Sequence, residues 1–255
     1  IERRSDRGHE AAWEYVKEGE FGKVKVSRAE FYRLGESIGK ATGPTEVPPT
    51  LDYDIWLGPA AKEPMDRMKF HYDWHWFWNT GNGEIGNNGP HHLDLARRFL
   101  GDPLGPARIL TVAGRFLYDD DAETPNHGFA FYDYPGGPPL LFQFTNLPVK
   151  KDMKAVGNYK GVKEGAVIHC EKGYVAGGFA YDEDGKKIPG AEFKIDNGKF
   201  HLDNFIAAVR KRDLQTPESD IEVGHRSTTL CHLANIPYRL GKEAPPAATH
   251  EIGRA

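Results

Sequence analysis

Four strand-like segments in close succession most constrain how this chain can fold. Each is short, rich in β-branched and aromatic residues, and bounded by clusters of glycine, proline, aspartate and asparagine, as is typical of strands joined by turns. The segments are PARILTVAGRFL (106–117), HGFAFYDYPG (127–136), PPLLFQFTNL (138–147) and GAVIHCEKGYVAGG (165–178). This succession predicts a mostly antiparallel sheet.

Other patterns predict the elements around that sheet. KVKVSRAEFYRL (23–34) alternates as a strand does, and DEDGKK (182–187) is typical of a tight turn. Helices are expected at HEAAWEYVKEG, HLDNFIAAVRKR and VGHRSTTLCHLANIPYRLG. Residues 36–64, rich in proline and aromatics, predict an ordered but irregular surface segment. The expected fold is α+β, an open, mostly antiparallel mixed sheet with helices packed on one face.

Composition and missing motifs exclude several function classes. A length of 255 residues allows an ample core, and a net charge of −4 argues against a nucleic-acid partner. No apolar run reaches the about 18 residues of a membrane span. Cys170 and Cys231 fit no metal-binding spacing and are expected to be core thiols, with a single disulfide between them as the alternative. No glycine-rich dinucleotide loop follows a strand, so the chain alone is not expected to bind a nicotinamide cofactor.

The stretch GNGEIGNNGPHHLDLARRFLG (81–101) carries the candidate catalytic residues. Its glycines permit close approach of the backbone to a ligand or to another element, and Pro90 suits the start of a helix. His91 would lie in the first turn, where a neutral imidazole can accept a proton or bind a substrate hydroxyl. Asn87 lies about one turn upstream and could share that ligand. The alternative is that His91 only caps or packs the helix.

Aromatic residues just before this stretch predict a sugar-binding platform, because carbohydrate faces pack on aromatic rings. The expected substrate-binding residues are Tyr53, Tyr72, His75, Trp76, Asn88 and His92. Core packing is the alternative for these aromatic side chains. His71 and His75 are four residues apart and, on a helix, would be weak candidates for a shared metal ion.

The chain resembles the carboxy-terminal half of the Gfo/Idh/MocA oxidoreductases in its bacterial form. That family carries Asp-x-Gly-x-His-x-x-Asp where this sequence reads Asn87-Asn88-Gly89-Pro90-His91-His92-Leu93-Asp94. Three further stretches share the resemblance: PPTLDYDIWLGPA (48–60), HYDWHWFW (71–78) and GHRSTTLCHLANIPYRLG (224–241). The catalytic histidine of the family corresponds to His91. Its usual aspartate corresponds to Asn87, which puts a proton relay through that position in doubt.

The resemblance implies one substrate-binding and oligomerisation domain over residues 1–255, with a sheet like that of dihydrodipicolinate reductase. Residues 1–20 would be the remnant helix of the junction to a missing Rossmann domain. NAD(P) is then expected only if that domain is supplied. The implied partners are a sugar or cyclitol and further copies of this chain bound through the open sheet. The compartment stays open between cytoplasm and, with an upstream export signal, periplasm.

Two other function classes remain open on the sequence. One is a cofactor-independent lyase or hydrolase acting on sugars, with or without a metal ion. The other is a non-catalytic carbohydrate-binding module built on the same sheet. The missing glycine loop argues against autonomous dehydrogenase activity in every case.

Overall fold

The computed structural model describes residues 1–19, 21–69, 71–150, 153–213 and 215–241. The predicted single domain over 1–255 therefore includes a last stretch, 242–255, that lies outside the described residues. The helical elements are η1 (Glu2–Ser5), α1 (Arg7–Lys17), α2 (Tyr53–Leu57), η2 (Asp73–Trp76), α3 (Gly83–Asn87), α4 (Gly89–Arg98), α5 (His201–Lys211) and α6 (Ile221–Leu240). The strands are β1 (Val24–Tyr32), β2 (Arg108–Gly114), β3 (His127–Asp133), β4 (Leu140–Thr145), β5 (Glu164–Cys170), β6 (Gly173–Ala176), β7 (Phe179–Tyr181) and β8 (Lys187–Glu192).

The strands form one open sheet in the order β2-β3-β4-β1-β5-β6-β7-β8. β1 lies parallel to β4, with Ser27 opposite Leu140, and every other described pairing is antiparallel. The α+β class and the open mixed sheet predicted from the sequence are confirmed. The strand expected over 106–117 is shorter than predicted and ends at Gly114.

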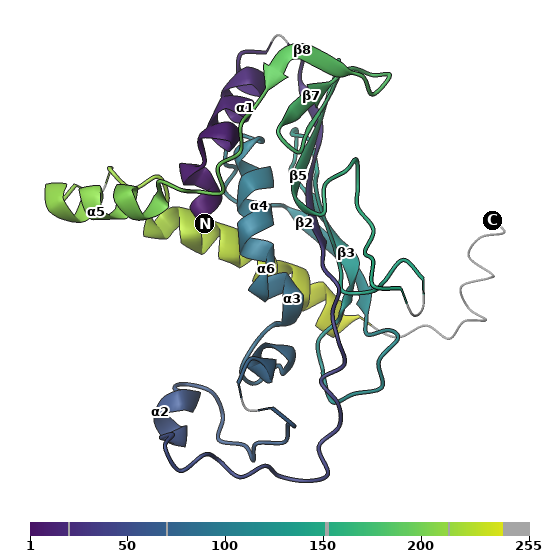
Figure 1. The fold of residues 1–255 in the computed structure, drawn as a ribbon, viewed down its shortest axis with the longest axis vertical. Coiled ribbons are helices and arrows are strands. Elements are labelled where there is room, and N and C mark those ends of the chain that lie inside the picture. The colour runs from purple at the N-terminus through teal and green to yellow at the C-terminus, as the bar shows by residue number, and fades with distance from the viewer. Residues whose placement is uncertain (20, 70, 151–152, 214, 242–255) are drawn as a thin grey trace.

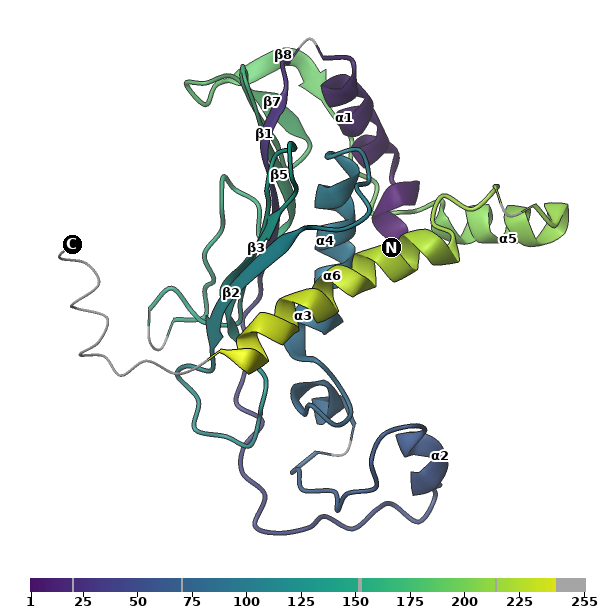
Figure 2. The same ribbon diagram turned by 180° about the vertical axis from the view of Figure 1, so that it is seen from behind.

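One face of the sheet carries the core. Successive side chains of a strand point to opposite faces, so the inward set of β1 is Ser27, Ala29 and Phe31. These residues pack with inward residues of β3 and β4 against α4 and α6, which contribute Leu93, Ala96, Leu230, Cys231 and Ala234. Figures 1 and 2 show α1, α4 and α6 on this same side of the sheet. The helices expected on one face are thus observed.

α1 belongs to the body of the domain. Asp6 caps it by accepting a hydrogen bond from the backbone of His9, and the helix ends before Gly19, as expected. Its Ala12 and Val16 pack with Leu95, Phe99 and other residues in a second apolar cluster. The segment expected to be a junction remnant therefore contributes side chains to the core.

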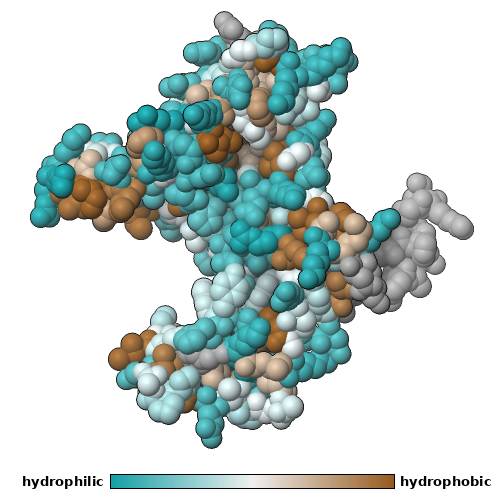
Figure 3. Space-filling view, viewed as in Figure 1, coloured by the Kyte–Doolittle hydropathy of each residue, from teal (hydrophilic) through white to brown (hydrophobic). Residues whose placement is uncertain are grey.

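An excursion from the sheet, residues 33–82, separates β1 from α3. It contains α2 and η2, its other described residues are irregular as predicted for residues 36–64, and it lies at one end of the molecule (Figures 1 and 3). The expectation that His71 and His75 share a helix is wrong. Tyr72 has φ +70, outside the right-handed helical region, and the single turn of η2 begins only at Asp73.

Two further predictions concern the cysteines and the membrane. Cys170 and Cys231 are both buried and free, as expected for core thiols. No helix in the described part of the chain has the length and apolar character that a bilayer crossing requires.

Candidate functional site

The candidate site is built where α3 runs into α4. Gly83 opens α3 with φ +67, a conformation that glycine adopts without steric cost. A Cβ on Gly81 would lie 2.4 Å from the Cα of His75, so this glycine lets the segment just before α3 pack closely against η2. The glycines were expected to allow close approach of the backbone to a ligand or to another element. At Gly81 the backbone approaches another element, η2. Asn87 ends α3, and Asn88 and Gly89 then start α4.

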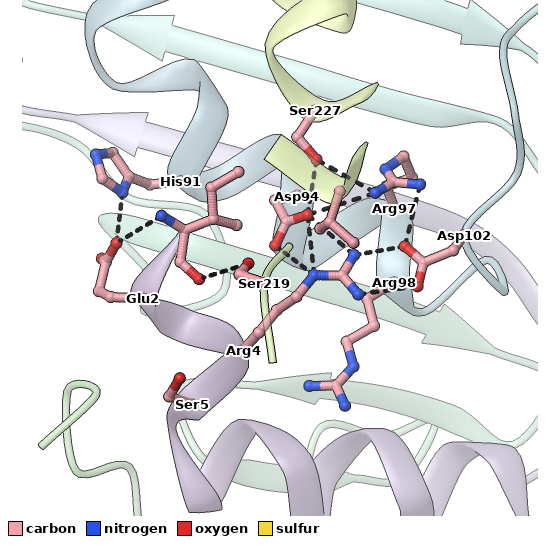
Figure 4. Close-up of polar contacts among 12 residues, drawn as sticks. Glu2, Arg4, Ser5, His91, Asp94, Arg97, Arg98, Asp102, Ser219 and Ser227 are labelled. Carbon is pink, nitrogen blue, oxygen red and sulfur yellow. Dashed lines mark hydrogen bonds and ion pairs between the residues drawn. The ribbon is translucent and has the colours of Figure 1, made fainter. Parts of the chain in front are cut away.

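His91 lies in the first turn of α4, as predicted, and its side chain is partly exposed. Its Nδ1 lies 2.8 Å from Oε2 of Glu2 in η1 (Figure 4). The hydrogen bond from His91 holds the pKa of Glu2 well below its usual range, so Glu2 is a carboxylate and can only accept. Nδ1 therefore carries the hydrogen, and in the neutral form of the ring the lone pair is on Nε2.

His92 points the other way. Its side chain is only 1% exposed, and its ring stacks on Phe31 of β1 at a centroid distance of 5.6 Å. Burial lowers the pKa of His92 far below its usual range, so the ring is neutral. Packing accounts for this side chain, and its predicted role in substrate binding stays a prediction.

A buried carboxylate, Glu84, joins two other candidate residues. The amide of Asn88 donates a hydrogen bond to Oε2 of Glu84, and the amide of Asn146 lies 3.5 Å from its Oε1. Nε2 of His75 lies 4.0 Å from the same Oε1, while its Nδ1 is 2.6 Å from the carbonyl of Tyr72. His75 and Asn88 are therefore brought together around a residue that the sequence did not single out.

The start of the chain is fixed to α4 by a buried ionic cluster, shown in Figure 4. The guanidinium of Arg4 makes a bidentate contact to Asp94, with Nε 2.8 Å from Oδ2, and also binds Asp102. Ser227 of α6 donates to Asp94 at 2.7 Å, and Arg97 lies 3.1 Å from Asp102. Because Arg4 and Asp94 are both buried, this cluster fixes the position of η1 and hence of Glu2.

The remaining candidates lie in the excursion. Tyr53 stacks on Trp56 and donates its hydroxyl to the carbonyl of Glu63, within its own loop. Trp76 is buried beneath the guanidinium of Arg115, whereas Tyr72 is exposed. In both ribbon views α2, which carries Tyr53, lies at the far end of the molecule from α4 (Figures 1 and 2). Tyr53 is thus not brought to His91.

Neither a metal nor a dinucleotide site is formed by these residues. Among the described residues, no three histidine, cysteine, aspartate or glutamate side chains gather as metal ligands. Gly81, Gly83 and Gly86 have the spacing of a dinucleotide loop, but Gly81 follows a turn, and Gly83 and Gly86 already lie within the five-residue helix α3. A phosphate cradle needs a strand before the loop and a longer helix after it, so the described residues do not fit the cofactor.

Comparisons with known proteins agree with this architecture. The WlbA dehydrogenase from Bordetella pertussis, solved with NADH and UDP-GlcNAcA, superimposes with a TM-score of 0.56 at 16% identity, covering 96% of this chain and 61% of its own. An oxidoreductase from Thermotoga maritima gives a TM-score of 0.56 at 14% identity, covering 91% and 57%. At such identities the likeness concerns the fold, and this chain spans about three fifths of either protein. No protein of curated function matches the sequence.

A family model adds sequence-level evidence. Residues 22–124, from the start of β1 through α4 and β2, match the model described as oxidoreductase family, C-terminal alpha/beta domain. This range contains the α3–α4 stretch and His91. The resemblance expected from the sequence is confirmed over this range: residues 22–124 match the C-terminal α/β domain of the Gfo/Idh/MocA oxidoreductases.

Proposed function

We propose that this chain is the substrate-binding domain of a sugar or cyclitol oxidoreductase and that His91 is the base that accepts the proton of the substrate hydroxyl. The observation that carries the proposal is the pairing of His91 with Glu2. A carboxylate bound to Nδ1 leaves the lone pair on Nε2, which has no hydrogen bond to any residue that the structure describes. This is the arrangement of an oriented general base.

The proposal assigns hydride acceptance to a nicotinamide bound outside the described residues. This chain supplies the sugar site and the proton acceptor, and by itself it is not expected to bind NAD(P). Asn87 would contribute a hydrogen bond to a hydroxyl, but its amide cannot relay a proton as a carboxylate can. The open face of the sheet would carry the contact between copies of the chain, because its exposed side includes Leu110, Val112 and Phe129.

The test is His91→Ala in a protein that also carries the dinucleotide-binding domain. Loss of a positioned base typically lowers the rate by about 10²- to 10⁴-fold, so kcat for sugar oxidation should fall by that factor. The matched control is His225→Ala, which removes an exposed histidine from α6 and should leave kcat unchanged. Full kcat in His91→Ala would show that His91 has only a structural role, in its contact with Glu2.

A further inference from the structure

An aromatic groove lies between the excursion and the C-terminal half of α6. It consists of two adjoining pockets of about 550 and 520 Å³ that share Trp74, Asn79 and Thr80. Volumes of this size are typical of small-molecule sites. The groove is separate from the sugar-binding residues expected from the sequence, because neither His75 nor Trp76 lines it.

Tryptophan side chains form the apolar walls of the aromatic groove. Trp74 lines both pockets and is 43% exposed, whereas Trp56 and Trp78 each line one of them. An exposed indole face offers a flat apolar surface to the C–H groups of a pyranose ring. Asn79 fixes this geometry, since its amide exchanges two hydrogen bonds with the backbone of Ala61, at 2.9 and 3.1 Å.

Polar groups line the floor of the groove on the α6 side. Asn235 is 5% exposed; its amide donates to the carbonyl of Asn82 at 3.2 Å, while its Oδ1 has no partner among the described residues. The side chains of Asn82 and His232 approach to 3.4 Å at the same place. A buried carboxamide and an adjacent imidazole can donate to and accept from sugar hydroxyls.

The groove has a positive end. The guanidinium of Arg239 lies over the ring of Trp78, 4.8 Å from its centroid, and makes no ion pair with a described residue. Stacking holds the guanidinium plane, and its N–H groups, which bind no described residue, can donate to an anionic oxygen. Among the described residues, no aspartate or glutamate lines either pocket. The lining therefore favours a ligand with negative charge over a neutral or cationic one.

We propose that the aromatic groove binds a pyranoside that carries an anionic group, with the sugar ring on Trp74 and the anionic group at Arg239. Carboxylate and phosphate both match a guanidinium, so the shared chemistry is an anionic oxygen on or next to the ring. This inference goes beyond the proposed function, because it concerns a second saccharide site away from His91.

Calorimetric titration of the 255-residue chain at low ionic strength tests the proposal. The probes are methyl β-D-glucuronide, glucose 6-phosphate and methyl β-D-glucoside. At least one charged probe should bind about 10-fold more tightly than the neutral glucoside, since a charge-assisted hydrogen bond contributes about 1.5–3 kcal/mol. If the glucuronide binds more tightly than glucose 6-phosphate, the anionic group of the ligand is a carboxylate. If glucose 6-phosphate binds more tightly, the anionic group is a phosphate.

Three variants make the outcome specific. Arg239→Gln should reduce the charged probes to the affinity of the glucoside, and Trp74→Ala should weaken all three. Phe116→Ala is the control, because Phe116 is 51% exposed and lines a different pocket. Equal affinity for charged and neutral probes, or no effect of Arg239→Gln, would overturn the proposal even if Trp74→Ala does not fold. Binding needs no cofactor, so this result is independent of the kcat of His91→Ala.

Discussion

His91 and Glu2 are 89 positions apart in the chain, yet Nδ1 of the histidine and Oε2 of the glutamate lie 2.8 Å apart. The partner of the proposed base thus comes from η1, which Arg4 fixes to α4 through Asp94. A carboxylate in this position orients the ring and stabilises the imidazolium that forms when the base takes up a proton.

Glu2→Ala should therefore lower kcat while leaving KM nearly unchanged. A hydrogen bond to a charged group is worth about 1.5–3 kcal/mol, which corresponds to about 10- to 100-fold in rate if it acts in the transition state. Steady-state kinetics with the dinucleotide-binding domain present measures this, and Glu2→Gln, which can still accept from Nδ1, should recover part of the loss. A role of Glu2 in stability alone would leave kcat unchanged.

The pH dependence of stability should reflect His9. Burial, opposed by Asp6, lowers its pKa to about 4 from 6.5, so between these values the unfolded state binds the proton more readily than the folded state. The free energy of unfolding should therefore be highest above pH 6.5. It should fall by about 3 kcal/mol as the pH decreases from 6.5 to 4. Urea unfolding of His9→Gln should show a smaller decrease between pH 7 and 4. The exposed His225→Gln should behave like the wild type, and an unchanged decrease in His9→Gln would contradict this account.

Asp94→Asn should destabilise the domain strongly. Asp94 is fully buried between Arg4, Arg97 and Ser227, and removing one partner of a buried ion pair costs about 3–5 kcal/mol. Thermal unfolding should show this loss, whereas Glu222→Gln, which breaks a surface pair with Arg226, should cost less than about 1 kcal/mol. Similar losses in both variants would mean that the cluster is not structurally important.

The contact between copies of the chain can be tested on the open face of the sheet. Val112→Glu places a charge in the middle of the exposed apolar row and should convert a dimer into a monomer without unfolding it. Leu104→Glu is the control, since Leu104 is also apolar and is more exposed than Val112 but lies outside the strands. Light scattering at tens of micromolar reports the outcome, and a monomeric wild type would contradict the proposal.

Local sequence patterns predicted most elements of the fold. The alternation of apolar and polar residues predicted β1, and apolar residues at helical spacing predicted α1, α5 and α6. Each pattern could be recognised because the element buries one face. The parallel pairing of β1 with β4 could not be read in this way, since it depends on which distant strand covers β1. The position of His91 in the first turn of α4 was likewise predictable, because Gly89 and Pro90 favour a helix start there.

The rest of the site depends on distant contacts. Nothing in the residues around Glu2 indicates that it will meet His91, because η1 is placed by the buried pair of Arg4 and Asp94. In the excursion, Trp74 and Trp76 alternate with His75, but the chain there makes a single 3₁₀ turn. Periodicity therefore could not show that Trp74 is open and Trp76 buried.

The central position of β1 also determines the order in which the chain can acquire its structure. β1 is made early, but its two neighbours, β4 and β5, follow only after residues 33–139 and 33–163. Closing such long loops is slow, because the entropy is lost before the strand contacts form. During synthesis, β1 would remain unpaired on both edges until β4 has emerged from the ribosome. Newly synthesised chains truncated before β4 should therefore be the ones that aggregate or need a chaperone.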